Sequence, residues 1–92
     1  MNAEAAASIA QDALIWLAGQ PDLLGTFLSA SGAGPGDLRR QAGDPEFLGF
    51  VLDFLLGSDD QLRAFAASAG ISPDAPMRAR AALPGGGNPD WT

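Results

Sequence analysis

Apolar residues recur every three or four positions near the start of the chain. Ile9, Ala13 and Trp16 fall on one side of a helical projection, and polar residues fall on the other. This pattern predicts a helix from about Ala3 to Ala18, which Gly19 ends.

Start and stop signals predict further short helices along the rest of the chain. Asp44 followed by Pro45 is the clearest start, because a side-chain acceptor precedes a proline that fits the first helical turn. Pro76 conflicts with a last helix that begins at Pro73, and a start near Asp74 or Ala75 removes the conflict. The expected segments are Pro21 to Gly32, Pro35 to Gly43, Asp44 to about Leu56, Ser58 to Gly70, and a last helix after Ser72.

These signals predict an all-α fold, a compact bundle of five to six short helices. Residues 1–84 form the expected single domain, and the Gly-rich residues 85–92 the expected flexible tail. In the second and fifth helices the spacing predicts inward side chains, namely Leu24, Phe27 and Leu28, and Leu62, Phe65, Ala66 and Ala69.

The chain also matches itself when it is shifted so that Leu14 falls on Leu52, an alignment that we call the repeat alignment. The size of this shift lies in the range of helical repeats. Nine residues between Leu14 and Gly43 are identical to their counterparts, among them Gly19 with Gly57, and the matches fall on helix ends, caps and apolar positions. We therefore predict two similar three-helix units in tandem, residues 14–43 and 52–81, related by an approximate twofold axis.

The two predicted units differ at one informative position. The segment FLGFVLDFLL is apolar on nearly every side except a stripe of Glu46, Gly49, Asp53 and Gly57, so its helix is expected to be central in the bundle or shared with a partner. The counterpart of Asp53 is Ile15, an aliphatic residue on a polar face. Ile15 is either an ordinary exposed apolar residue or an anchor for a partner or a second copy of the chain.

Composition argues against catalysis. The sequence has no His, Cys, Lys or Tyr, so the usual acid–base groups and nucleophiles are absent. Asp53 is the only acid in an apolar setting, and solvation or pairing with an arginine is the interpretation we favour. The acidic groups at residues 44–46 and 59–60 are explained by helix capping, so we expect no metal and no cofactor. No small-molecule substrate is evident.

Eleven acids and five basic residues give a net charge of −6, which opposes binding to nucleic acid or to an anionic membrane surface. Arg39, Arg40, Arg78 and Arg80 are a candidate basic patch in a helix-turn-helix arrangement, or else they pair with nearby acids and helix ends. Trp91, near the end of the tail, is a candidate contact residue. No apolar run reaches membrane-spanning length and the first residues do not resemble a signal peptide, so we expect a cytoplasmic location.

Short segments resemble a known family. GPGDL at residues 34–38, Asp44-Pro45, DFLL at residues 53–56 and FAA at residues 65–67, together with the length, resemble the short alphaproteobacterial proteins of domain of unknown function 3572. The resemblance extends from Ala3 to Pro84 and implies a bacterial cytoplasmic protein. It implies no activity and no functional residues.

The sequence thus favours a non-enzymatic module that binds another protein or itself. The alternative is a small regulatory protein that contacts nucleic acid through the four arginines. An enzyme that uses Asp53 ranks third.

Overall fold

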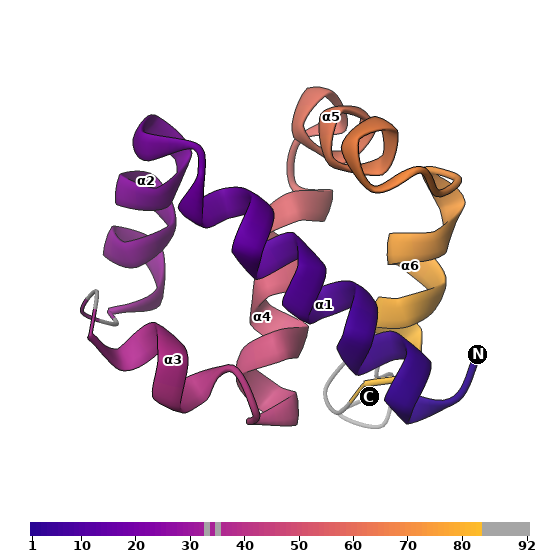
Figure 1. Ribbon diagram of the computed structural model, residues 1–92, viewed down its shortest axis with the longest axis horizontal. Helices are drawn as coiled ribbons and strands as arrows, with labels where there is room; N and C mark the ends of the chain where they lie inside the picture. The colour runs from indigo at the N-terminus through magenta and orange to yellow at the C-terminus, as the bar shows by residue number, and fades with distance from the viewer. Residues whose placement is uncertain (33, 35, 84–92) are drawn as a thin grey trace, which may run out of the picture.

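Six helices connected by short turns make up the computed structural model, which describes residues 1–32, 34 and 36–83 (Figure 1). They are α1 (Ala3–Ala18), α2 (Pro21–Ser31), α3 (Asp37–Gln41), α4 (Pro45–Leu56), α5 (Asp59–Ala69) and α6 (Asp74–Ala81). The predicted all-α class is confirmed.

Local capping sets most helix ends. The Asp44 carboxylate accepts a hydrogen bond from the Glu46 amide at 3.0 Å, and the Ser58 hydroxyl accepts one from the Gln61 amide at 3.4 Å. The helix α6 begins at Asp74, which places Pro76 in the first turn, where it removes no helical hydrogen bond. Asn2 caps α1 through its side chain, a cap that the sequence did not reveal.

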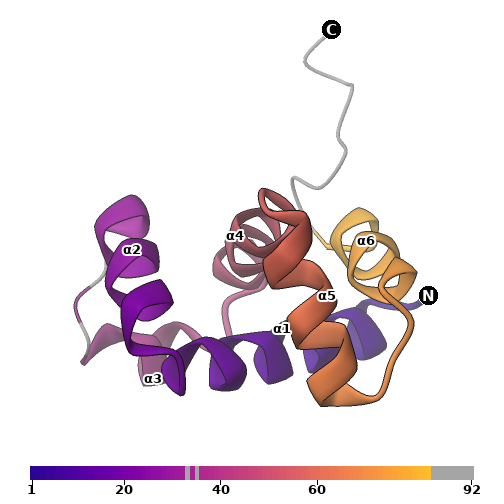
Figure 2. The ribbon, with the colours of Figure 1, turned by 90° about the horizontal axis from the view of Figure 1, so that it is seen from above.

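The apolar helix α4 lies at the centre of the bundle, as expected from its sequence. It packs against α1, α5 and α6, and its Val51, Leu52 and Leu55 are fully buried. The helix α1 crosses α4, with α2 and α3 on one side of this pair and α5 and α6 on the other (Figures 1 and 2). In α1 the small residues Ala6 and Ala10 are fully buried, which allows its close packing on α4 and α6.

Four predicted positions need correction. Ala69 is exposed, because it lies in the last turn of α5, beyond the part of the helix that covers the core. Gly49 is buried, so the polar stripe of α4 does not include it. In α2 only Phe27 is fully buried, and Leu24 and Leu28 are half-buried because α2 lies at the edge of the bundle.

Helix ends and turns correspond closely in the repeat alignment. The bounds of α2 coincide with those of α5 at both ends, and α1 and α4 end at corresponding residues. Gly32 and Gly70 end α2 and α5 in the same left-handed conformation, with φ of 74° and 71°. These correspondences agree with the predicted duplication, which itself stays a prediction.

The aromatic contacts between the two predicted units are reciprocal. Phe27 packs on Phe54 with ring centroids 5.3 Å apart, and Trp16 packs on Phe65 at 6.0 Å. Trp16 corresponds to Phe54, and Phe27 to Phe65, so each unit contributes one member of each pair. Exchanged contacts of this kind are typical of a twofold relation.

Candidate functional site

A groove lies between α1 and α3. Its volume is about 360 Å³, and it is lined by Leu14, Ile15 and Ala18 of α1 and by Leu38, Arg39 and Ala42 in and after α3. Ile15 is 71% exposed, which confirms its predicted position on the solvent-facing side of α1. We call this surface the α1–α3 groove.

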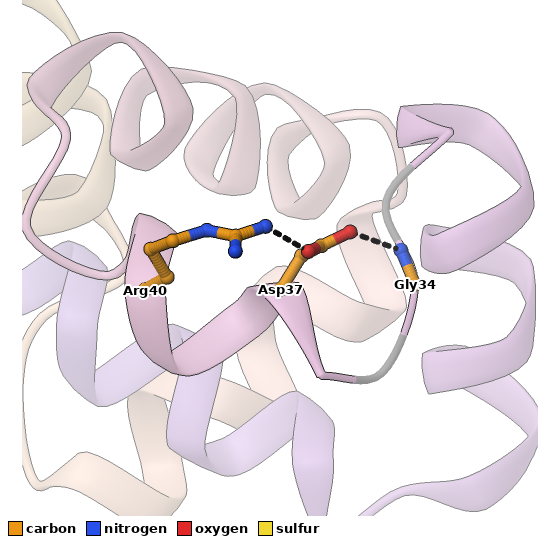
Figure 3. A network of polar contacts seen from close by, with 3 residues as sticks. All are labelled: Gly34, Asp37 and Arg40. Atoms are coloured by element: carbon orange, nitrogen blue, oxygen red, sulfur yellow. Dashed lines mark hydrogen bonds and ion pairs between the residues drawn. The ribbon is translucent and has the colours of Figure 1, made fainter.

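The short helix α3 is held in place by contacts at both of its ends. At its start, the Asp37 carboxylate accepts a hydrogen bond from the Gly34 amide at 3.0 Å and forms an ion pair with Arg40 (Figure 3). At its end, the Gln11 side-chain amide of α1 donates a hydrogen bond to the Ala42 carbonyl oxygen at 2.9 Å. The Gln11 hydrogen bond joins the two walls of the groove, whereas the Asp37 contacts stabilise the start of α3 itself.

The corresponding position in the second half carries an ion pair. In the repeat alignment, Ile15 corresponds to Asp53 and Ala42 corresponds to Arg80. Arg80 donates two hydrogen bonds to the Asp53 carboxylate, from Nε at 2.6 Å and from Nη2 at 2.9 Å. This bidentate pair links α4 to α6, whereas the equivalent positions of the first half are apolar and border an open groove.

The four arginines of the candidate basic patch do not come together. Arg39 and Arg40 belong to α3, Arg78 and Arg80 belong to α6, and these two helices lie on opposite sides of α4 (Figures 1 and 2). Arg40, Arg78 and Arg80 each form an ion pair with an aspartate. The geometry therefore does not favour a nucleic-acid interface made of these residues.

The remaining candidates among the described residues take part in pairing or capping. Asp53 pairs with Arg80, which agrees with the interpretation we favoured for it. Asp44 caps α4, and Ser58 rather than Asp59 or Asp60 caps α5 through its side chain. Trp91 lies outside the described residues.

Sequence reasoning identified Ile15 and Arg39 but did not place them in one site. It missed Leu38 and Ala42, whose role depends on how far α3 lies from α1. The usable signal was the repeat alignment, in which two apolar side chains stand where the second half has the charges of Asp53 and Arg80.

Residues 3–86 match the model of a family described as protein of unknown function (DUF3572). The chain belongs to this family. No curated protein and no solved structure matches the chain. Since the description of the DUF3572 family gives no activity, the function of this member has to be inferred from its own groove. Among the described residues, no helix is both long and apolar enough to cross a membrane.

Proposed function

We propose that this DUF3572 member is a non-enzymatic protein-interaction module, and that the α1–α3 groove is its binding site. One observation carries the proposal: Ile15, 71% exposed, borders a groove lined by apolar side chains. Exposed aliphatic residues are ordinary when they occur singly. Beside a groove, the same residue can be buried together with its apolar neighbours when a partner binds.

The second half supports this interpretation by contrast. Where the first half has Ile15 and Ala42, the second half has the Asp53–Arg80 pair, which joins its two helices directly. Two of the six residues that line the groove thus stand, in the repeat alignment, where the second half has a salt bridge.

The lack of His, Cys, Lys and Tyr supports a non-enzymatic role. The net charge of −6 favours partners whose surfaces are basic overall.

The test is co-purification from the cell of origin with three forms of the protein: wild type, Ile15→Asp and Met77→Asp. Met77 is 54% exposed on α6, away from the groove, so its variant is a matched control for a new surface charge. Burial of an aliphatic side chain is worth about 1.5–3 kcal/mol, so Ile15→Asp should weaken a partner's binding roughly tenfold or more. At least one protein should be recovered with wild type and with Met77→Asp, and be depleted with Ile15→Asp.

Equal recovery of every protein by the three forms would exclude the groove as the binding site. Light scattering at several concentrations tests self-association in parallel. A dimer that Ile15→Asp dissociates and Met77→Asp preserves would identify a second copy of the chain as the occupant.

The proposal includes a bacterial cytoplasmic setting, which is supported by the family resemblance. Fractionation of the cell of origin tests it, and recovery of the protein with the membrane or outside the cell would contradict it.

A further inference from the structure

Arg39 differs from the other four arginines in its pairing. Among the described residues it is the one arginine without an ion pair, although it is exposed and lines the groove. The other pairs are Arg40–Asp37, Arg63–Asp59, Arg78–Asp74 and Arg80–Asp53.

Asp37, the acid of α3, already pairs with groups other than Arg39. Both oxygens of Asp37 are engaged, one by the Gly34 amide and the other by Arg40 (Figure 3). Arg39 therefore lines a largely apolar groove and has no carboxylate partner from its own helix. A guanidinium in this setting matches a ligand that has an apolar side and a carboxylate beside it.

The exposed face of α1 has the opposite charge. Glu4, Ser8, Asp12 and Ile15 follow one another along one side of the helix, and all four are exposed. Neither Glu4 nor Asp12 forms an ion pair with a described residue. Acidic side chains thus precede Ile15 along α1, and the basic Arg39 lies on the α3 wall of the groove that Ile15 borders.

Resting on the proposed function, we infer that the occupant of the groove is an amphipathic helix of another protein with a matching order of side chains. Its apolar residues, spaced three and four apart, pack on Ile15 and Leu38. An Asp or Glu at one end of this apolar face pairs with Arg39, and Lys or Arg at the other end faces Asp12 and Glu4. A helix of several turns suits this surface, because the acidic residues continue along α1 well beyond the groove.

This order of charges agrees with the net charge of the chain. An acidic protein attracts a partner that is basic overall, and the single carboxylate at Arg39 then fixes the direction in which the helix lies. A second copy of the chain is less favoured, since two molecules of charge −6 repel each other.

The experiment selects helices from a phage-displayed library with randomised surface positions on one fixed helical scaffold. The full chain is the bait, and the parallel baits are Arg39→Glu, Ile15→Asp and, as the matched control, Arg78→Glu on α6. All three positions are exposed, and circular dichroism verifies that each variant keeps the helical content of wild type.

Wild type should select an apolar pair with an acid at one end and a basic residue at the other. Helices selected by the Arg39→Glu bait should carry Lys or Arg in place of that acid. Helices selected by Arg78→Glu should show the same pattern as those selected by wild type. A synthetic selected peptide should bind wild type about tenfold more tightly with Glu than with Gln at the acidic position, and this preference should vanish on Arg39→Gln.

The alternative outcomes separate the two proposals. If the selected helices need Ile15 but carry no acid, and Arg39→Glu selects the same pattern, the inference about the partner is wrong and the groove remains a binding site. If the selected helices bind Ile15→Asp as well as wild type, or if none is enriched over that variant, both proposals are wrong. An Ile15-dependent dimer in light scattering would replace the partner helix by a second copy.

Discussion

At the scale of single residues, the Asp53–Arg80 pair is a bidentate salt bridge that joins two helices, α4 and α6. The Arg80 side chain is only 13% exposed and the Asp53 side chain 51%, so the pair is partly shielded from water. The Arg63–Asp59 pair lies within α5, and its side chains are 71% and 69% exposed. Shielding and bidentate geometry should make the first pair the stronger of the two.

Double-mutant cycles can measure this difference. We expect a coupling free energy of about 1–2 kcal/mol between Asp53 and Arg80 from Asp53→Asn, Arg80→Gln and the double variant, measured by urea unfolding. The matched cycle, Asp59→Asn with Arg63→Gln, should give less than about 0.5 kcal/mol. Equal coupling energies in the two cycles would show that burial of Arg80 does not strengthen its pair.

At this scale the sequence predicted which side chains are exposed better than it predicted which side chains pair. The exposure of Ile15 follows from helical spacing alone, because its neighbours on the face are polar. Pairing of Asp53 with an arginine was part of the favoured interpretation, but Arg80 was not named as the partner, since the two lie far apart in the chain and only the folded bundle brings them together.

At the scale of helices, local rules explain most boundaries. The predicted starts at Pro21, Asp44 and Ser58 and the ends at Gly32 and Gly70 agree with the structure, because caps and left-handed glycines act within one turn of the chain. The groove could not be predicted in this way. It depends on the distance between α1 and α3, which is determined by packing and by the Gln11–Ala42 hydrogen bond.

Substitution by alanine should change the free energy of unfolding in opposite directions at two glycines. Gly70 ends α5 with φ of 71°, a conformation that costs a residue with a side chain about 1–2 kcal/mol, so Gly70→Ala should lower the free energy of unfolding. Gly25 lies inside α2, and an added Cβ there would have no atom within 4 Å. Gly25→Ala should therefore stabilise the protein by about 0.5–1 kcal/mol through helix propensity. Urea unfolding of both variants tests the signs, and a stabilising Gly70→Ala would contradict the cap.

At the scale of the whole molecule, the two predicted three-helix units share one core. Phe27 of the first unit packs on Phe54 of the second unit, and also on Phe47 and Phe50, which precede that unit in the same helix α4. Trp16 of the first unit in turn packs on Phe65 of α5. The helix α1 also packs on α6, so neither unit buries its own apolar face without the other.

This shared core predicts that the chain unfolds in one step, although its sequence repeats. In a Trp91→Phe background Trp16 is the only tryptophan, and its contact with Phe65 reports on the junction between the units. Urea unfolding followed by Trp16 fluorescence and by far-ultraviolet circular dichroism should give coincident transitions, because losing either unit exposes the core of the other. If the units were independent, they would separate while their helices remained folded. The Trp16 fluorescence would then change at a lower urea concentration than the circular dichroism. That separation would show that the duplicated units retain autonomous folding, which the exchanged aromatic contacts argue against.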